Sequence, residues 1–132
     1  MPKTNNKDLC GVYREYYDKD NTKIESELFM MNGKKEGVYK EYHDNGQLFV
    51  EVNYIDDKRN GIYKLYRDNG KLWDEVNYID DKKNGIHKSY YYNGQLYYEL
   101  NYIDDIKNGI FKSYYDNGQL YEEVNYIDGK KV

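Results

Sequence analysis

The chain contains no alanine and only one proline, one tryptophan and one cysteine among its 132 residues. Alanine is the strongest helix former, so its absence argues against a helical protein. Leu, Ile, Val and Phe together make up only about a fifth of the chain, which is little for an aliphatic core. Nineteen tyrosines offset this deficit, and tyrosine favours strands. The composition predicts an all-β protein whose buried surface is largely aromatic.

The chain also lacks an excess of positive charge and long apolar runs. Its 20 basic and 24 acidic residues give a net charge of -4, which argues against a nucleic-acid-binding surface. A mean hydropathy of -1.15 argues against a transmembrane helix. The first ten residues are too polar for a secretory signal, and Cys10 alone cannot form an intramolecular disulfide. We therefore expect a cytoplasmic protein in which Cys10 is a partly buried, unreactive thiol.

A repeat of 24 residues organises most of the chain. Gly37, Gly61, Gly85 and Gly109 open four successive copies, and Gly11 opens a longer, degraded copy whose two extra residues fall within 18–22. The predicted units are 11–36, 37–60, 61–84, 85–108 and 109–132. Residues 1–10 are predicted to form a polar N-terminal cap. Repeats of this length indicate stacked supersecondary units.

Each unit has the pattern of a β-hairpin. Two runs rich in aromatic and β-branched residues flank Asn45-Gly46, and Asn-Gly between such runs is the strongest short signal for a type I′ hairpin turn. The dipeptide recurs at Asn69-Gly70, Asn93-Gly94 and Asn117-Gly118. Short charged connections should keep successive strands antiparallel neighbours. The predicted fold is an elongated, single-layer antiparallel meander of about ten strands built from five stacked hairpins.

A two-residue turn at Asn45-Gly46 fixes the strand register. It places Lys40 opposite Glu51, a pair that recurs as Lys64–Glu75, Lys88–Glu99 and Lys112–Glu123, with Arg14–Glu27 in the first unit. It also predicts the aromatic pairs Tyr42–Phe49, Tyr66–Trp73, Tyr90–Tyr97 and Tyr114–Tyr121. One face should carry Val38, Lys40, Tyr42, Phe49, Glu51, Asn53 and Ile55. The other should carry Tyr39, Glu41, His43, Leu48, Val50, Val52 and Tyr54.

The first of these faces is nearly uniform from unit to unit, whereas the second varies. We hypothesise that the uniform face carries the repeating ladder and that the varied face meets a specific partner. The alternative is that the varied positions are solvent-exposed sites that drift. The candidate partner-binding residues are Tyr39, Glu41, Tyr63, Leu65, Arg67, His87, Tyr98 and Phe111.

Residue patterns typical of catalysis or metal binding are missing from the sequence. The two histidines, His43 and His87, occupy non-equivalent positions, and each replaces an aromatic residue of another copy. One cysteine and two scattered histidines cannot form a zinc site. The Asp-Asp turns could supply oxygen ligands for calcium, but neighbouring lysines and arginines indicate a solvated edge instead. We expect no catalytic residues, no metal and no cofactor.

The repeated motifs resemble those of a known family. Gly-[IV]-x-Lys, Tyr-x-x-Asn-Gly-[QK]-Leu, Glu-[VL]-Asn-Tyr-Ile-Asp and Lys-Asn-Gly recur over residues 11–132 and look like the variant MORN repeat. Bacterial proteins with this repeat include the YwqK-like family, which carries the label of toxin–antitoxin antitoxin. The resemblance implies a curved sheet of stacked hairpins that acts as a scaffold or protein-binding module.

Three functions follow as hypotheses. The first is a non-enzymatic scaffold that binds a protein partner through a sheet face, with the antitoxin role as a specific form of it. The second is recognition of a small ligand such as a glycan through the tyrosine-rich face. The third is association with lipid headgroups, which the acidic balance disfavours. The last strand, within 119–127, would be an open edge, so we expect either a monomer or a homodimer joined through it.

Overall fold

The computed structural model describes residues 10–132, so the predicted cap at 1–10 lies almost wholly outside the described residues. Ten long strands form the body of the fold. They are β1 (Gly11–Tyr16), β2 (Ile24–Met31), β4 (Gly37–Tyr42), β5 (Leu48–Ile55), β7 (Gly61–Tyr66), β8 (Leu72–Ile79), β10 (Gly85–Tyr90), β11 (Leu96–Ile103), β13 (Gly109–Tyr114) and β14 (Leu120–Ile127). Five two-residue strands complete the sheet: β3 (Lys34–Lys35), β6 (Lys58–Arg59), β9 (Lys82–Lys83), β12 (Ile106–Lys107) and β15 (Lys130–Lys131).

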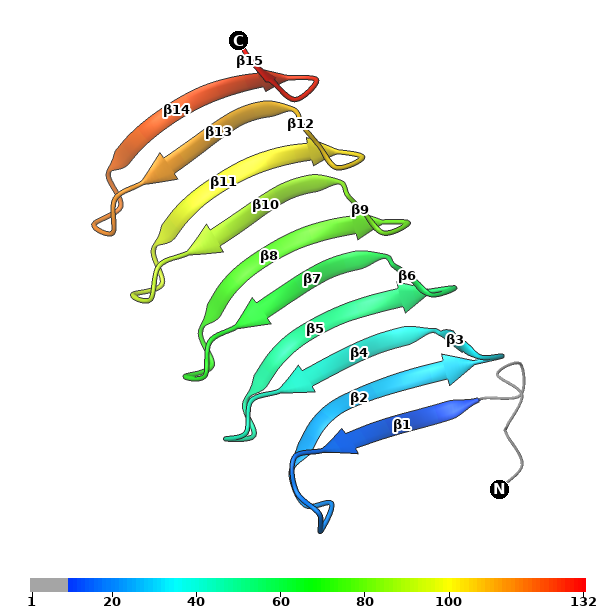
Figure 1. Ribbon diagram of the computed structural model, residues 1–132. Coiled ribbons are helices and arrows are strands. Elements are labelled where there is room, and N and C mark those ends of the chain that lie inside the picture. Colours follow the sequence, from blue (N-terminus) through cyan, green and yellow to red (C-terminus); the bar gives the residue numbers. More distant parts are fainter. Residues whose placement is uncertain (1–9) are drawn as a thin grey trace.

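All fifteen strands belong to one open antiparallel sheet. The long strands follow one another in chain order from β1 to β14, and they bow in the same direction, so the sheet forms a trough (Figure 1). Each short strand folds back on the end of the long strand before it. The all-β, single-layer array of stacked hairpins is therefore confirmed. Within the described part of the chain, no helix is long and apolar enough to cross a membrane.

The predicted Lys–Glu register is confirmed at the middle of every hairpin. Lys40 lies opposite Glu51 and Lys64 opposite Glu75, and Arg14 forms a 2.8 Å ion pair with Glu27. The same register continues between hairpins, because Glu51 also lies opposite Lys64. Basic and acidic residues therefore alternate across the whole sheet. Opposite charges on directly facing positions stabilise a sheet, whereas like charges destabilise it.

The Asn-Gly turns differ from the prediction. Gly46 has a φ of 87°, but Asn45 does not share this left-handed conformation, so the turn is not type I′. The His43 carbonyl accepts a hydrogen bond from Gly46 N at 2.9 Å, and His43 N donates to Gln47 O at 2.8 Å. The loop thus has three residues, a type I turn followed by a left-handed glycine. The sequence Asp44-Asn45-Gly46 suits this loop as well as it suits the predicted one.

A β-bulge next to each turn restores the predicted register. Tyr42 lies opposite Leu48 and Glu41 opposite Val50, so Phe49 is the extra residue. The predicted pairs Tyr42–Phe49, Tyr66–Trp73, Tyr90–Tyr97 and Tyr114–Tyr121 are therefore wrong, because Leu48, Leu72, Leu96 and Leu120 occupy those places. A bulge bends the strand that carries it. Bulges at the same place in every hairpin account for the common bow of the strands.

Type I′ turns occur at the opposite edge of the sheet. Asp56 and Asp57 both have positive φ, 52° and 68°, and they join β5 to β6. The same geometry holds at Asp80-Asp81, Asp104-Asp105, Asn32-Gly33 and Asp128-Gly129. The turns of the last four repeats also bond to the preceding repeat, as Asp81 N donates to Arg59 O at 3.0 Å. These turns stack the repeats along this edge.

The two faces of the sheet differ in burial. The inner face carries Tyr39, Glu41, Val50, Val52, Tyr54 and their counterparts at 24-residue intervals. The outer face carries Val38, Lys40, Glu51, Asn53, Ile55 and their counterparts. Val52 is 1% exposed and Leu100 4%, whereas Ile55 on the outer face is 53% exposed. Side chains converge on the concave side of a bowed sheet, so the varied face predicted to meet a partner also holds the core.

Candidate binding face

All eight predicted partner-binding residues lie on or beside the inner face. They come from β4, β7, β10, β11 and β13, apart from Arg67, which directly follows β7. His87 is buried and the other seven are half-buried. These residues are therefore not freely exposed, and most of them make specific contacts within the sheet.

The residue that precedes each Asn-Gly loop connects its repeat to the next one. His43 Nε2 lies 3.0 Å from Tyr66 O, Arg67 Nη2 donates to Tyr90 O at 2.9 Å, and Tyr91 donates its hydroxyl to Tyr114 O at 2.6 Å. Tyr17 does the same to Tyr42 O in the first unit. The side chain varies, but in each case its polar end forms a hydrogen bond with a backbone carbonyl of the next repeat. Variation at Arg67 therefore reflects alternative donors for a structural hydrogen bond.

The same residues pack on the bulge residues. His43 lies on Phe49 with ring centroids 4.4 Å apart, and Tyr91 lies edge-on to Tyr97 at 4.7 Å. Arg67 takes the equivalent place over Trp73, with its guanidinium carbon 4.8 Å from the ring centroid. The bulge thus places Phe49 and its counterparts on the inner face, not on the uniform face where the sequence placed them.

Polar groups in the first half of the inner face are largely paired. Tyr39 donates its hydroxyl to Glu41 Oε1 at 2.5 Å, and burial raises the pKa of Tyr39 far above its ordinary value, helped by the Glu41 carboxylate. Tyr63 packs edge-on against Tyr78, and burial raises its pKa too. Leu65 lies on β7 opposite Val50. Tyr39, Glu41 and Tyr63 also line a hollow of about 370 Å³, so this half of the inner face brings together three of the eight predicted residues.

His87 lies on β10 in the fourth repeat and bonds to the third repeat. Its Nε2 is 2.8 Å from Asp74 Oδ1, and its ring packs edge-on against Tyr98 at 5.4 Å. Its Nδ1 is buried without a hydrogen-bond partner. His87 therefore combines a carboxylate and an aromatic face in a mostly buried position.

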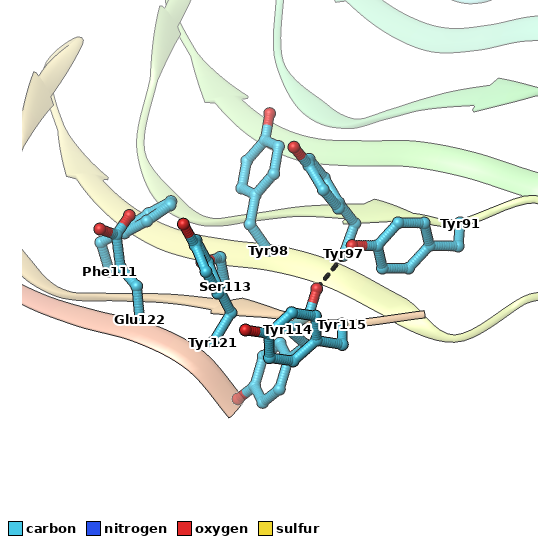
Figure 2. Close-up of a pocket in the computed structure, with 9 residues that line it drawn as sticks. All are labelled: Tyr91, Tyr97, Tyr98, Phe111, Ser113, Tyr114, Tyr115, Tyr121 and Glu122. Carbon is cyan, nitrogen blue, oxygen red and sulfur yellow. Dashed lines mark hydrogen bonds between the residues drawn. The ribbon is translucent and has the colours of Figure 1, made fainter. Parts of the chain in front are cut away.

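The second half of the inner face holds an open aromatic pocket (Figure 2). The pocket has a volume of about 460 Å³, within the range of ligand sites in proteins. Its lining residues come from the end of β10, from β11 and from the β13–β14 hairpin. They are Tyr91, Tyr97, Tyr98, Phe111, Ser113, Tyr114, Tyr115, Tyr121 and Glu122. Of the eight predicted residues, the pocket brings together Tyr98 and Phe111.

Two polar groups distinguish the pocket from the rest of the inner face. Ser113 is 8% exposed, and its Oγ has no hydrogen-bond partner. Glu122, directly opposite Ser113 on β14, is exposed. The rings of Tyr97, Tyr115 and Tyr121 are 44%, 49% and 63% exposed. The pocket thus offers aromatic faces, one carboxylate and one unsatisfied hydroxyl.

Metal binding finds no support in the part of the chain that the structure covers. Residues 10–132 contain no group of three or more His, Cys, Asp or Glu side chains that could hold an ion. The carboxylates of the Asp-Asp turns are instead used within the sheet. Asp81 Oδ1 accepts a hydrogen bond from Arg59 N, and Arg59 holds the pKa of Asp81 below its ordinary value. Likewise Lys34 lies 2.8 Å from Asp56 and lowers its pKa.

Sequence reasoning missed Tyr97, Tyr115, Tyr121, Ser113 and Glu122 as a group. Tyr97 and Tyr121 were assigned to the outer face because the bulge was not foreseen. One signal was available: a position held by Arg67 in the third unit is Tyr91 and Tyr115 in the last two. That change concentrates tyrosines in the last third of the chain.

The chain was compared with known proteins. The family model described as "MORN repeat variant" matches residues 35–56, 59–80, 83–104 and 107–128, two thirds of the chain. No curated protein matches. A chain in the solved structure "Crystal Structure of TarM" is similar, with a TM-score of 0.45 and 13% sequence identity. That match covers 74% of this chain and 19% of the other, so this chain spans about a fifth of that protein.

Proposed function

Because the chain belongs to the MORN repeat variant family, we propose that it is a non-enzymatic scaffold that binds a protein partner along the inner face of its sheet. The aromatic pocket formed by the fourth and fifth repeats is the anchor point. The rest of the trough supplies a rigid surface beside it. The expected cytoplasmic location belongs to the same proposal.

The exposure of the pocket tyrosines is the observation that carries the proposal. Tyr121 is 63% exposed on the face that otherwise holds the core, and Tyr97 and Tyr115 are nearly half exposed. Tyrosine gives a large, rigid contact area with a polar tip, and it is enriched where proteins bind one another. Its concentration in one pocket favours a binding role over a packing role.

The shape of the sheet supports an extended partner segment. The strands bow into a trough that runs along the array (Figure 1), and the inner face repeats every 24 residues. Solenoid-like arrays use such elongated concave surfaces for binding. Several inner-face side chains bond to neighbouring repeats, which reduces the ordering free energy lost on binding.

The antitoxin role is a specific form of this proposal. It rests on the resemblance of the repeats to the YwqK-like family, and the comparisons above carry no such label. Its test is genetic: a neighbouring gene whose expression arrests growth should be tolerated when this protein is co-expressed. Failure of that rescue removes the antitoxin role and leaves the scaffold proposal standing.

A pair of matched variants tests the proposed face. Tyr97→Ser with Tyr121→Ser removes the exposed pocket rings, while Ile62→Ser with Ile86→Ser removes two side chains of the outer face, each 53% exposed. Affinity capture from the native cell should recover a protein with the wild type and the outer-face variant but not with the pocket variant. Binding measured between the purified partner and each purified variant should then show the same ranking, with the pocket variant binding most weakly. A partner lost only with the outer-face variant would overturn the proposal.

A further inference from the structure

We infer that the aromatic pocket receives the guanidinium group of an arginine side chain from the partner, an inference that rests on the proposed function. The acceptor site consists of the rings of Tyr97, Tyr98 and Tyr121, the Glu122 carboxylate and the Ser113 hydroxyl. The pocket is thereby selective for a planar cation.

The chain itself provides the first argument, because it fills equivalent positions with its own cations. The guanidinium of Arg67 lies over Trp73, with 4.8 Å between its central carbon and the ring centroid. Trp73 occupies the bulge position that Tyr97 and Tyr121 occupy one and two repeats later. Cations over aromatic faces are attracted by the negative face of the ring. The bulge position of this fold is therefore suited to a stacked cation.

Other rings of the inner face also lie under a cation from the chain itself. The tyrosine near the end of each second strand, in four successive repeats, has a cation over its face. The pairs are Lys35 on Tyr54, Arg59 on Tyr78, Lys83 on Tyr102 and Lys107 on Tyr126, at 4.1–5.2 Å from the ring centroids. Arg59 on Tyr78 is the closest of them, at 4.1 Å.

The pocket rings have no such cation from the described residues 10–132. The position of Arg67 is taken by Tyr91 and Tyr115 in the last two repeats, so the group that would lie over Tyr97 and Tyr121 is an aromatic ring edge. Tyr97 and Tyr121 nevertheless remain 44% and 63% exposed. A cation supplied by another molecule can stack on the part of these rings that Tyr91 and Tyr115 leave exposed.

The polar groups of the pocket match the same ligand. Glu122 takes the inner-face position that Asp74 holds two repeats earlier, and Asp74 bonds the nitrogen of His87, a side chain that also packs on Tyr98. One side chain of this sheet, His87, thus already contacts a carboxylate and an aromatic ring together. Ser113 lies opposite Glu122, and its buried Oγ lacks a partner. A guanidinium has enough donors to bond both the carboxylate and the hydroxyl.

Arginine fits these groups better than lysine or a sugar. A guanidinium is planar, stacks on aromatic faces and is weakly hydrated, whereas an ammonium is a compact and strongly hydrated charge. The hydroxyls of a neutral sugar can donate hydrogen bonds to Glu122, but a sugar carries no charge that would neutralise the carboxylate. The acidic net charge of -4 also favours approach of a basic segment.

The test uses the full chain and small probes observed by NMR. N-acetyl-arginine-amide should shift the resonances of Tyr97, Tyr121 and Ser113 in a saturable way at millimolar concentration. N-acetyl-citrulline-amide, its uncharged isostere, should bind at least fivefold more weakly, and methyl glucoside should give no saturable shift. Equal binding of the arginine and citrulline probes, or tighter binding of the glucoside, would overturn the inference.

Adjacent glutamates provide a matched control. Glu122→Gln should weaken arginine binding at least threefold, whereas Glu123→Gln changes the net charge equally but lies opposite Lys112 in the charge ladder and should leave binding unchanged. Circular dichroism should show that both variants keep the sheet. Equal loss in the two variants would mean that only overall charge matters, and the inference would be wrong.

A third variant supplies the cation from within the chain. Tyr115→Arg places a guanidinium where Arg67 lies relative to Trp73, so it should occupy Tyr121 and reduce binding of the arginine probe at least fivefold. The result separates this inference from the proposed function. If Glu122→Gln and Tyr115→Arg retain partner capture while the double tyrosine variant loses it, the scaffold role stands and the arginine site falls.

Discussion

Tyr91 donates its hydroxyl to the carbonyl oxygen of Tyr114 at 2.6 Å, and this hydrogen bond joins the fourth repeat to the fifth (Figure 2). His43 and Arg67 contact the corresponding carbonyls of the next repeats. Three chemically different side chains thus serve one structural role. In a linear array each interface between repeats contributes its own term to stability. The bond from Tyr91 therefore contributes to the stability with which the last hairpin packs on the fourth repeat.

Removing this hydroxyl should loosen the last hairpin. Tyr91→Phe leaves the Tyr114 carbonyl without its donor, and the free energy of unfolding should fall by about 1 kcal/mol. Urea denaturation measures the loss. The amide hydrogen-exchange rates of β13 and β14 should rise more than those of β4 and β5, because opening at one interface between repeats stays local.

The matched control is Tyr115→Phe. Tyr115 is the equivalent residue of the last repeat, and its hydroxyl makes no hydrogen bond among residues 10–132. Stability should change by less than about 0.5 kcal/mol. Equal losses in the two variants would show that the ring position, and not the hydrogen bond to Tyr114, determines the effect.

The two aspartates of one type I′ turn should respond differently to glycine. Both have positive φ, 48° at Asp80 and 70° at Asp81, a conformation that glycine adopts without strain. Asp81 also accepts a hydrogen bond from the backbone nitrogen of Arg59 and pairs with its side chain.

Asp80→Gly should therefore leave stability unchanged or raise it by up to about 0.5 kcal/mol. Asp81→Gly should lower it by about 1 kcal/mol, because the bonds to Arg59 outweigh the relief of strain. Thermal unfolding of the two variants side by side makes the comparison. A loss with Asp80→Gly as large as with Asp81→Gly would contradict this account of the turn.

The fold could be predicted because the repeat and the strand alternation both appear in the sequence. The register was recoverable from the recurrent Lys40–Glu51 pair, even though the turn beside it was assigned wrongly. A three-residue loop plus one bulge residue returns the strands to the same pairing as a two-residue turn. The type I′ turns were harder to identify, since Asp56-Asp57 lacks glycine. Its counterparts Asn32-Gly33 and Asp128-Gly129 carry the usual signature.

The candidate site was less predictable than the fold. Side-chain alternation placed Tyr98 and Phe111 on the correct face, but it cannot show a bulge, and the bulge moves Tyr97 and Tyr121 to that face. Alternation also cannot tell which side of a single sheet is concave. Burial of the varied face follows from the bow of the strands, which is a property of the assembled array.

The alternating charges of the outer face give a test of sheet pairing. Lys64 lies opposite Glu51 on one side and Glu75 on the other. Lys64→Glu would place three carboxylates in a row and should lower the free energy of unfolding by about 1–2 kcal/mol, since each cross-strand charge pair contributes about 0.2–1 kcal/mol. Lys64→Gln, which removes attraction without adding repulsion, should cost about half as much. The difference should shrink in concentrated salt, and a difference that persists there would point to packing instead of charge.

Alkaline pH should destabilise the protein through its half-buried tyrosines. Burial, together with the hydrogen bond that Tyr90 donates to Glu75 Oε1 at 3.0 Å, raises the pKa of Tyr90 from 10 to about 12. The raised pKa means that the folded state keeps its proton where the unfolded state has lost it. This contribution is therefore complete below pH 10 and disappears as the pH rises towards 12. Burial raises the pKa of Tyr63 and Tyr98 in the same direction.

The free energy of unfolding should accordingly fall between pH 10 and 12, in step with tyrosinate absorbance of the unfolding protein. Tyr90→Phe should make this fall less steep, because phenylalanine cannot ionise and the hydrogen bond that the Tyr90 hydroxyl donates to Glu75 is absent. At neutral pH the variant should lose about 1 kcal/mol, the usual contribution of one hydrogen bond. Urea denaturation at several pH values follows both effects. An unchanged alkaline slope in Tyr90→Phe would show that other tyrosines, and not the Tyr90–Glu75 pair, set the response.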